Sequence, residues 1–167
     1  MQPWTPANPA FSDVVRESFA RQSMMATLGA EIVHLAPGEV DLAAPFAPQF
    51  GQQNGFWHAG AVASLGDSAN GYAAFTLAPA GTDVLAVEFK INLLAPATGE
   101  RFVACGRVVR PGRTLTVCQA DVFAETSGGA GATSEPARKL VATMSSTLFV
   151  RFRSPLPPAE EGQGGCG

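Results

Sequence analysis

One carboxylate stands apart from its surroundings in this chain. Asp67 is the only formally charged residue in the stretch 58–77, which otherwise consists of apolar and small residues and one histidine. Burying an unpaired carboxylate is costly, so Asp67 needs a basic partner, a neighbouring helix to cap, or a chemical use. An ionised carboxylate can activate water as a general base or attack an acyl carbon as a nucleophile.

His58 begins the same stretch, nine residues before Asp67. Nine helical residues span roughly 13–14 Å, so one chain cannot bring the two side chains together, whereas in a symmetric dimer the start of one helix and the middle of its partner can face one ligand. The unpaired N–H groups of a helix start make those of Ala59 and Gly60 candidate donors to a developing oxyanion. The alternative is that His58 only hydrogen-bonds a carbonyl at the helix start.

The stretch 58–77 is predicted to be a long buried helix. Its bulky residues share one face, and its small residues share the opposite face with Asp67. With a single charge it must be enclosed by protein on nearly all sides. A sheet around it would provide that enclosure, and four segments rich in β-branched and aromatic residues predict its strands: 83–94, 101–110, 114–125 and 138–151.

The rest of the chain predicts an α+β fold of one domain, residues 1–153. Asn8-Pro9 indicates the start of an amphipathic helix over 9–28, ended by Gly29. Segments 30–36 and 39–45 form a hairpin around Pro37-Gly38, and the Pro/Gly-rich tail 154–167 is predicted to be disordered. A strand over 83–94 at a sheet edge would expose unpaired backbone groups, so we expect it to pair with a second copy.

Composition excludes several classes of partner. The chain has 167 residues with 11 Lys+Arg against 14 Asp+Glu and 15% charged residues, which leaves no broad basic face for nucleic acid or membrane. It shows no signal peptide or bilayer-spanning run, which favours a cytoplasmic protein. Three cysteines without metal-ligand spacing predict reduced thiols and no metal site, although a hairpin closed at Pro111-Gly112 would place Cys105 opposite Cys118.

One motif resembles a known family. Gln52-Gln-Asn-Gly-Phe-Trp-His58-Ala-Gly60, followed by Asp67-Ser-Ala-Asn-Gly-Tyr-Ala, is similar to the signature of hot-dog-fold acyl-CoA thioesterases of the phenylacetate-degradation type. In that family Asn-x-x-Gly-x-x-His-Gly-Gly leads into a central helix wrapped by an antiparallel sheet, and an Asp follows the His by nine residues. VEFKINLLAPATGE and RVVRPGRTLTV resemble its later strands, so the resemblance covers about residues 30–149.

The resemblance implies hydrolysis of an acyl-CoA to a carboxylic acid and coenzyme A, without metal or cofactor. Asp67 would be the general base or nucleophile, and the N–H of Ala59 would polarise the thioester carbonyl. His58 would orient the loop or that carbonyl, and Gln52 would place thioester or water.

The resemblance also implies substrate-binding residues and an oligomer. It implies a homodimer or homotetramer with sites between subunits. Coenzyme A phosphates would meet a few exposed cations, and the loop and helix start would contact the rest of the substrate. The candidate substrate-binding residues are Gly60, Asn54, Trp57, Lys90, Arg110 and Arg113.

Three positions depart from the family pattern. Ala59 stands where Gly is common, which leaves the N–H in place. Gln52 stands where Asn is common, and Gln53 or Asn54 can take that role if the loop shifts. Ala86 stands where some relatives have a Ser or Thr that holds the attacking water.

Two other functions are compatible with such a fold. A non-catalytic module that binds acyl-CoA or a small ligand would keep the fold without the chemistry. A hot-dog hydratase or dehydratase would need a different Asp/His or His/Glu arrangement, which the sequence does not contain.

Overall fold

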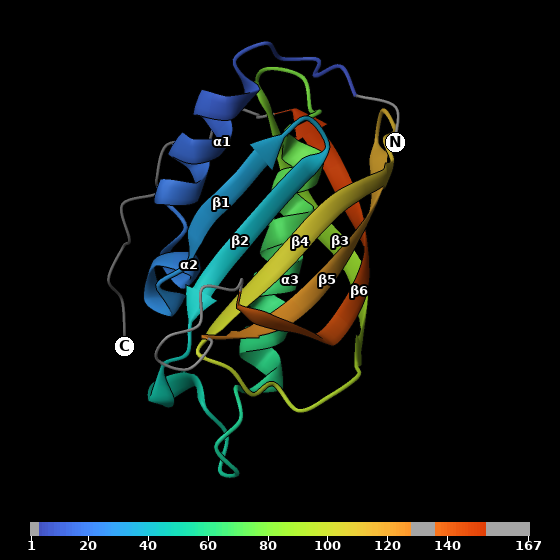
Figure 1. Cartoon of the computed structure of the whole chain (residues 1–167). Coiled ribbons are helices and arrows are strands. Elements are labelled where there is room, and N and C mark those ends of the chain that lie inside the picture. The colour runs from blue at the N-terminus through green and yellow to red at the C-terminus, as the bar shows by residue number, and fades with distance from the viewer. Residues whose placement is uncertain (1–3, 128–135, 153–167) are drawn as a thin grey trace, which may run out of the picture.

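A six-stranded antiparallel sheet curves around one long helix, α3 (Ala59–Phe75), as Figure 1 shows. The computed structural model describes residues 4–127 and 136–152, so the tail predicted for 154–167 lies outside them. This arrangement confirms the predicted α+β hot-dog fold. In spatial order the strands are β1 (Glu31–Ala36), β2 (Glu39–Pro45), β4 (Arg101–Arg110), β5 (Leu115–Thr126), β6 (Ala137–Phe152) and β3 (Thr82–Leu93).

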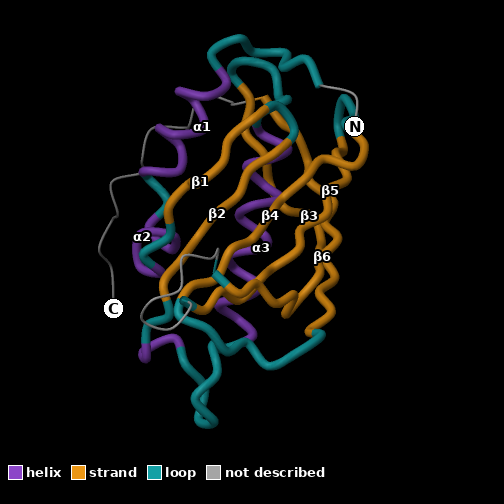
Figure 2. Tube along the Cα trace, in the orientation of Figure 1, coloured by secondary structure: helices purple, strands orange, loops and turns teal. Residues whose placement is uncertain are grey.

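The N-terminal part of the chain lies beside β1 (Figure 2) and differs from the prediction. The single helix expected over 9–28 is divided into α1 (Phe11–Ala20) and α2 (Ser23–Leu28), because Gln22 has an extended backbone, with φ −84° and ψ 97°. Val15 in α1 and Met25 in α2 are both fully buried. No Gly or Pro lies at the break, and a buried residue on each side of it holds the two helices in the core. Gly29 ends α2 in the left-handed conformation, as predicted.

Close contact with β4 fixes the position of α3. A Cβ added at Gly106 would lie 2.4 Å from the carbonyl carbon and oxygen of Ala69, so only glycine permits this approach. Two polar contacts hold the helix along its length. The Asn70 side-chain amide donates to the Ser146 hydroxyl of β6 at 2.8 Å, and the Thr76 hydroxyl accepts from the Gly38 N–H of the β1–β2 turn at 2.7 Å.

The two faces of α3 differ in burial. The bulky face is buried against the sheet, with Val62, Leu65 and Ala69 almost inaccessible to solvent. On the face of small residues, Ser64 and Gly71 are only half-buried, as is Asp67. The helix is therefore enclosed over most of its surface, as expected, but less completely on the face that carries Asp67.

β3 is an edge strand with exposed apolar side chains. It pairs with β6 on one side only. Val87 is 59% exposed, an unusual fraction for a valine in the middle of a twelve-residue strand. Other exposed apolar residues lie on or next to the strand: Leu85, Phe89, Leu93 and Leu94. An unpaired edge of this kind is a template for a second chain.

The β4–β5 hairpin corrects the expected cysteine pairing. Cys105 lies opposite Asp121, and Cys118 lies opposite Val108, because the connection between the strands is longer than a two-residue turn and places Arg110 opposite Val117. Cys118 is buried in the core, where burial raises the pKa of its thiol to about 12. The two thiols therefore lie at different positions of the ladder and do not form the pair that the turn predicts.

One charged substitution can test whether the copies pair through the edge of β3. Phe89→Asp, at a side chain 44% exposed in the single chain, should convert the expected dimer into a monomer by placing a carboxylate in the paired edge. Val33→Asp, at an equally exposed position (45%) on the opposite edge strand, is the matched control. Light scattering during gel filtration measures the mass. A dimer that survives Phe89→Asp would contradict pairing through β3.

Candidate active site

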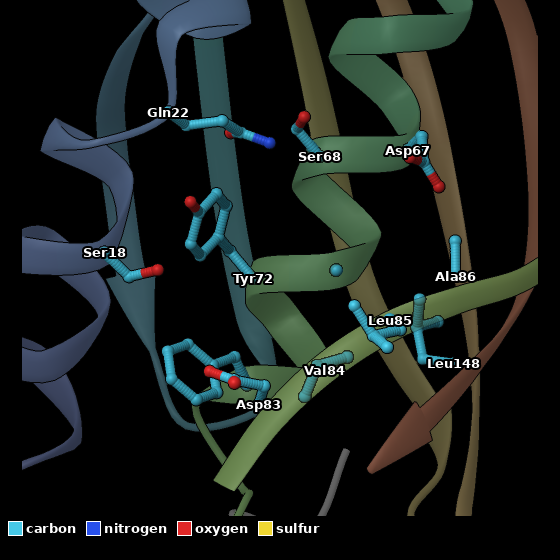
Figure 3. A pocket seen from close by; sticks show the side chains of 12 residues that line it. Ser18, Gln22, Asp67, Ser68, Tyr72, Asp83, Val84, Leu85, Ala86 and Leu148 are labelled. Carbon is cyan, nitrogen blue, oxygen red and sulfur yellow. The ribbon is translucent and has the colours of Figure 1, made fainter. Parts of the chain in front are cut away.

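Asp67 opens into a small cavity between α3, β3 and the α1–α2 junction, shown in Figure 3. This Asp67 cavity has a volume of about 250 Å³. It is lined by Ser18, Gln22, Asp67, Ser68, Gly71, Tyr72, Phe75, Asp83, Val84, Leu85, Ala86 and Leu148.

The Asp67 carboxylate has no compensating partner in the part of the chain that the structure describes. Its Oδ1 atom is buried and accepts no hydrogen bond there. Burial raises the pKa of the carboxyl above its ordinary value. The alternative of an Asp paired with an arginine is thus not seen within residues 4–127 and 136–152. A carboxylate with a raised pKa, exposed to a cavity, is typical of a functional site.

The start of α3 offers one free donor. His58 is the N-cap, and its Nδ1 atom accepts from the Gly60 N–H at 2.9 Å. A ring nitrogen that accepts cannot carry the proton, so the neutral ring is protonated at Nε2. Of the two predicted backbone donors, the Gly60 N–H is therefore occupied. The N–H of Ala59 donates to no described residue and remains available.

A second cavity of about 620 Å³ lies at this helix start. We call it the helix-start cavity. It lies between the loop before α3 and the end of β3, and it contains five predicted site residues: Gln52, Asn54, Trp57, His58 and Ala59. Its other lining residues are Gln53, Phe56, Val62, Leu93, Leu94, Ala95, Pro96, Ala97 and Val141.

Local hydrogen bonds hold the loop that precedes α3. The Asn54 N–H donates to Oε1 of Gln52 at 2.8 Å, and the Gly55 N–H donates to the Gln52 carbonyl at 2.9 Å. Trp57 stacks on Phe102 of β4 with ring centroids 4.3 Å apart, and its indole nitrogen is buried without a partner among the described residues. The loop is anchored at its Trp57 end, while Gln53 and Asn54 stay exposed.

The structure gathers some predicted site residues and separates others. His58 and Ala59 line one cavity and Asp67 lines the other. The three predicted phosphate-binding cations line neither of these cavities. Lys90 lies on β3, Arg110 ends β4, and Arg113 lines a third, more apolar cavity near the far end of α3. One chain therefore holds two halves of the predicted site.

Sequence reasoning missed Gln22, which enters the Asp67 cavity from the α1–α2 junction. In a continuous helix over 9–28, Gln22 would follow Val15 by seven residues and share its apolar face. A polar residue on that face was the signal that could have found it. Among the described residues, no group of His, Cys, Asp and Glu could hold a metal ion, and no helix is long and apolar enough to cross a membrane.

Comparisons with known proteins agree with this geometry. The family profile described as "Thioesterase superfamily" matches residues 54–130. That segment includes all of α3 together with His58 and Asp67. A thioesterase family protein from Silicibacter pomeroyi is 48% identical, with a TM-score of 0.80, over 86% of this chain and 99% of its own. The protein named "Putative esterase SSO2140" from Saccharolobus solfataricus is 31% identical over 63% of this chain and 74% of its own.

The chain belongs to the thioesterase superfamily. The predicted assignment as a thioester hydrolase with a hot-dog fold is confirmed at that level. The PaaI protein from the phenylacetic acid degradation operon of E. coli shares the fold of this thioesterase, with a TM-score of 0.71 at 17% identity over 86% of this chain and 94% of its own.

The burial of Asp67 predicts that the stability of the fold depends on pH. Because its folded-state pKa is raised, the ionised form destabilises the fold. That destabilisation is complete above the raised pKa and disappears as the pH falls below the unfolded-state value. Asp67→Asn should therefore raise the Tm of this thioesterase at pH 7. The increase should be roughly 2–4 °C for each ~1 kcal/mol gained in the free energy of unfolding.

Thermal unfolding at several pH values measures this effect. The advantage of Asp67→Asn should shrink as the pH is lowered, because the wild-type carboxyl then becomes neutral. Asp121→Asn, at a half-buried position on β5 outside both cavities, is the control and should leave Tm unchanged. A lower Tm for Asp67→Asn at pH 7 would show that the carboxylate is stabilised in the fold.

Proposed function

We propose that this thioesterase hydrolyses acyl-CoA thioesters to a carboxylic acid and coenzyme A, in a site built from two copies of the chain. One observation carries the proposal. The free Ala59 N–H and the unpartnered Asp67 carboxylate open into two different cavities of one chain. In an antiparallel dimer formed through β3, the helix start of one copy and Asp67 of the other can face the same thioester.

The Ala59 N–H would bind the thioester carbonyl oxygen and stabilise the oxyanion of the tetrahedral intermediate. Its position at the start of α3 adds the positive end of the helix dipole. His58 contributes indirectly, because its bond to the Gly60 N–H caps the helix and holds the first turn in place. Gln52, Asn54 and Trp57 would form the wall along which the thioester enters.

Asp67 would perform the chemistry by one of two routes. As general base it takes a proton from water while the water oxygen bonds to the acyl carbon; the C–S bond then breaks, and the proton passes to the leaving thiolate. As nucleophile its carboxylate displaces the thiolate directly, and water hydrolyses the resulting anhydride. Both routes require the ionised form. The raised pKa makes Asp67 a stronger base than an exposed carboxylate.

The coenzyme A phosphates would bind exposed cations outside both cavities. Lys90 on β3, Arg110 at the end of β4 and Arg113 in the following turn are all exposed. None of the three forms an ion pair with another described residue, so they remain our candidates for these contacts. Their position outside the lining of both cavities fits a ligand that crosses between copies.

Two variants test the chemistry directly. Thiol release from short, medium, long and aromatic acyl-CoAs should fall about 10²-fold or more in Asp67→Asn. Ala59→Pro removes the N–H alone, at a first-turn position where proline fits a helix and after a residue with a compatible ψ of 140°. It should cost about 10²–10³-fold in kcat.

Activity in wild type should also fall with decreasing pH through the raised pKa of Asp67.

Ala80→Pro, at an exposed position in the turn before β3, is the control for introducing proline. Unchanged thiol release in Asp67→Asn would contradict the proposed chemistry. Coenzyme A binding without turnover of any acyl-CoA would instead favour a ligand-binding module, in agreement with the absent hydroxyl at Ala86 in the Asp67 cavity.

Mixing the two inactive variants tests the two-copy site. A dimer with one Asp67→Asn chain and one Ala59→Pro chain has one site with both groups intact and one site with neither. Co-refolded or co-expressed mixtures should therefore regain up to about a quarter of wild-type activity, since half of randomly assorted dimers are hybrids with one intact site. No recovery, with hybrid dimers demonstrated by tag pull-down, would place both groups in one chain's site.

A further inference from the structure

Gln22 is a polar side chain with an unsatisfied atom inside the Asp67 cavity. Its Oε1 atom is buried and has no hydrogen-bond partner among the described residues. In Figure 3 it extends toward α3 from one side of the cavity, while Asp67 points toward Ala86 on the other side. The two unpartnered acceptors therefore mark opposite ends of one cavity. A buried acceptor without a donor is unfavourable and needs an explanation.

The polar residues next to Gln22 in the cavity lining are Ser18, Ser68 and Tyr72. Burial raises the pKa of the Tyr72 hydroxyl, and the neighbouring Ser18 side chain and Arg21 charge offset only part of that shift. Phe19 packs edge-on against Tyr72 with ring centroids 5.5 Å apart, so the ring is held in place. The Gln22 oxygen is the fully buried acceptor at this end of the cavity, among the described residues, that a ligand can satisfy.

Gly71 lies between the two ends of the cavity. It stands in the interior of α3, four residues after Asp67, where glycine destabilises a helix relative to alanine. A Cβ added there would meet no atom within 4 Å, so close packing within the chain does not require glycine. Its missing side chain instead keeps open the passage between Asp67 and Gln22.

We infer that the acyl group lies over Gly71, with its thioester end at Asp67 and its far end at Gln22. The inference rests on the proposed function and adds the substrate class: a compact acyl group that carries a hydroxyl at its far end. A hydroxyl both donates and accepts, so it satisfies the Gln22 amide in either orientation. The cavity of about 250 Å³ exceeds one of ~150 Å³ that holds benzene, which sets the size of this group.

The first experiment compares matched substrates. Wild type should hydrolyse ω-hydroxyacyl-CoAs with at least about ten-fold higher kcat/KM than the plain acyl-CoAs of the same length, within the range of four to eight carbons. Gln22→Leu should remove that preference while retaining turnover of the plain substrates. Gln119→Leu makes the same change on the exposed side of β5 and should retain the preference.

The second experiment tests the passage. Gly71→Ala and Gly71→Leu should lower kcat/KM for eight-carbon substrates progressively, with less effect on four-carbon ones. Gly71→Ala should not lower Tm, because alanine favours the helix. Gel filtration with light scattering checks that both variants keep the wild-type mass, since a changed mass would assign Gly71 to a contact between copies and overturn its role in the cavity.

The outcomes separate this inference from the proposed function. Efficient hydrolysis of plain acyl-CoAs, with no preference for the hydroxyl and no effect of Gln22→Leu, overturns the inference and leaves the thioesterase chemistry intact. Absence of hydrolysis with every acyl-CoA overturns both.

Discussion

The contact between α3 and β4 is the constraint on which the rest of the structure depends. Gly106 lets the backbone of α3 lie directly on the sheet at Ala69. The bulky face of the helix is then buried, whereas the opposite side is only half-buried. That side carries Asp67 and Gly71. The tight packing on one face thus produces the open face on which the chemistry depends.

A rigid helix also fixes how the catalytic groups relate to one another. The free N–H of Ala59 and the carboxylate of Asp67 belong to one helix, so their separation cannot adjust to a small thioester. In the proposed dimer a second copy removes that limit without altering the helix. The edge strand that needs a partner for its backbone groups would provide the two-fold contact. The proposed function therefore links oligomerisation and catalysis by geometry.

The fold places polar groups where they do not stabilise it. Asp67 and Gln22 each have a buried oxygen without a partner among the described residues. Gly71 occupies a helix position where alanine would be favoured. Functional sites commonly reduce stability in this way, because groups that are satisfied within the fold are not available to a ligand. The three residues share one cavity, which is why we interpret them together.

The sequence by itself determined the elements and the chemistry-bearing residues. Hydrophobic period and turn residues predicted the four long strands, the hairpin and the central helix, because those signals are local. The solitary charge of Asp67 and its spacing from His58 singled out these two residues as candidates for chemistry. Tertiary structure alone decided the rest. It divides the N-terminal helix at Gln22, it lengthens the β4–β5 connection so that Cys105 lies opposite Asp121, and it places Nδ1 of His58 on the Gly60 N–H. Each of these features depends on packing between residues distant in sequence or on the orientation of one side chain. Such packing and such orientations leave no periodic signal in the sequence.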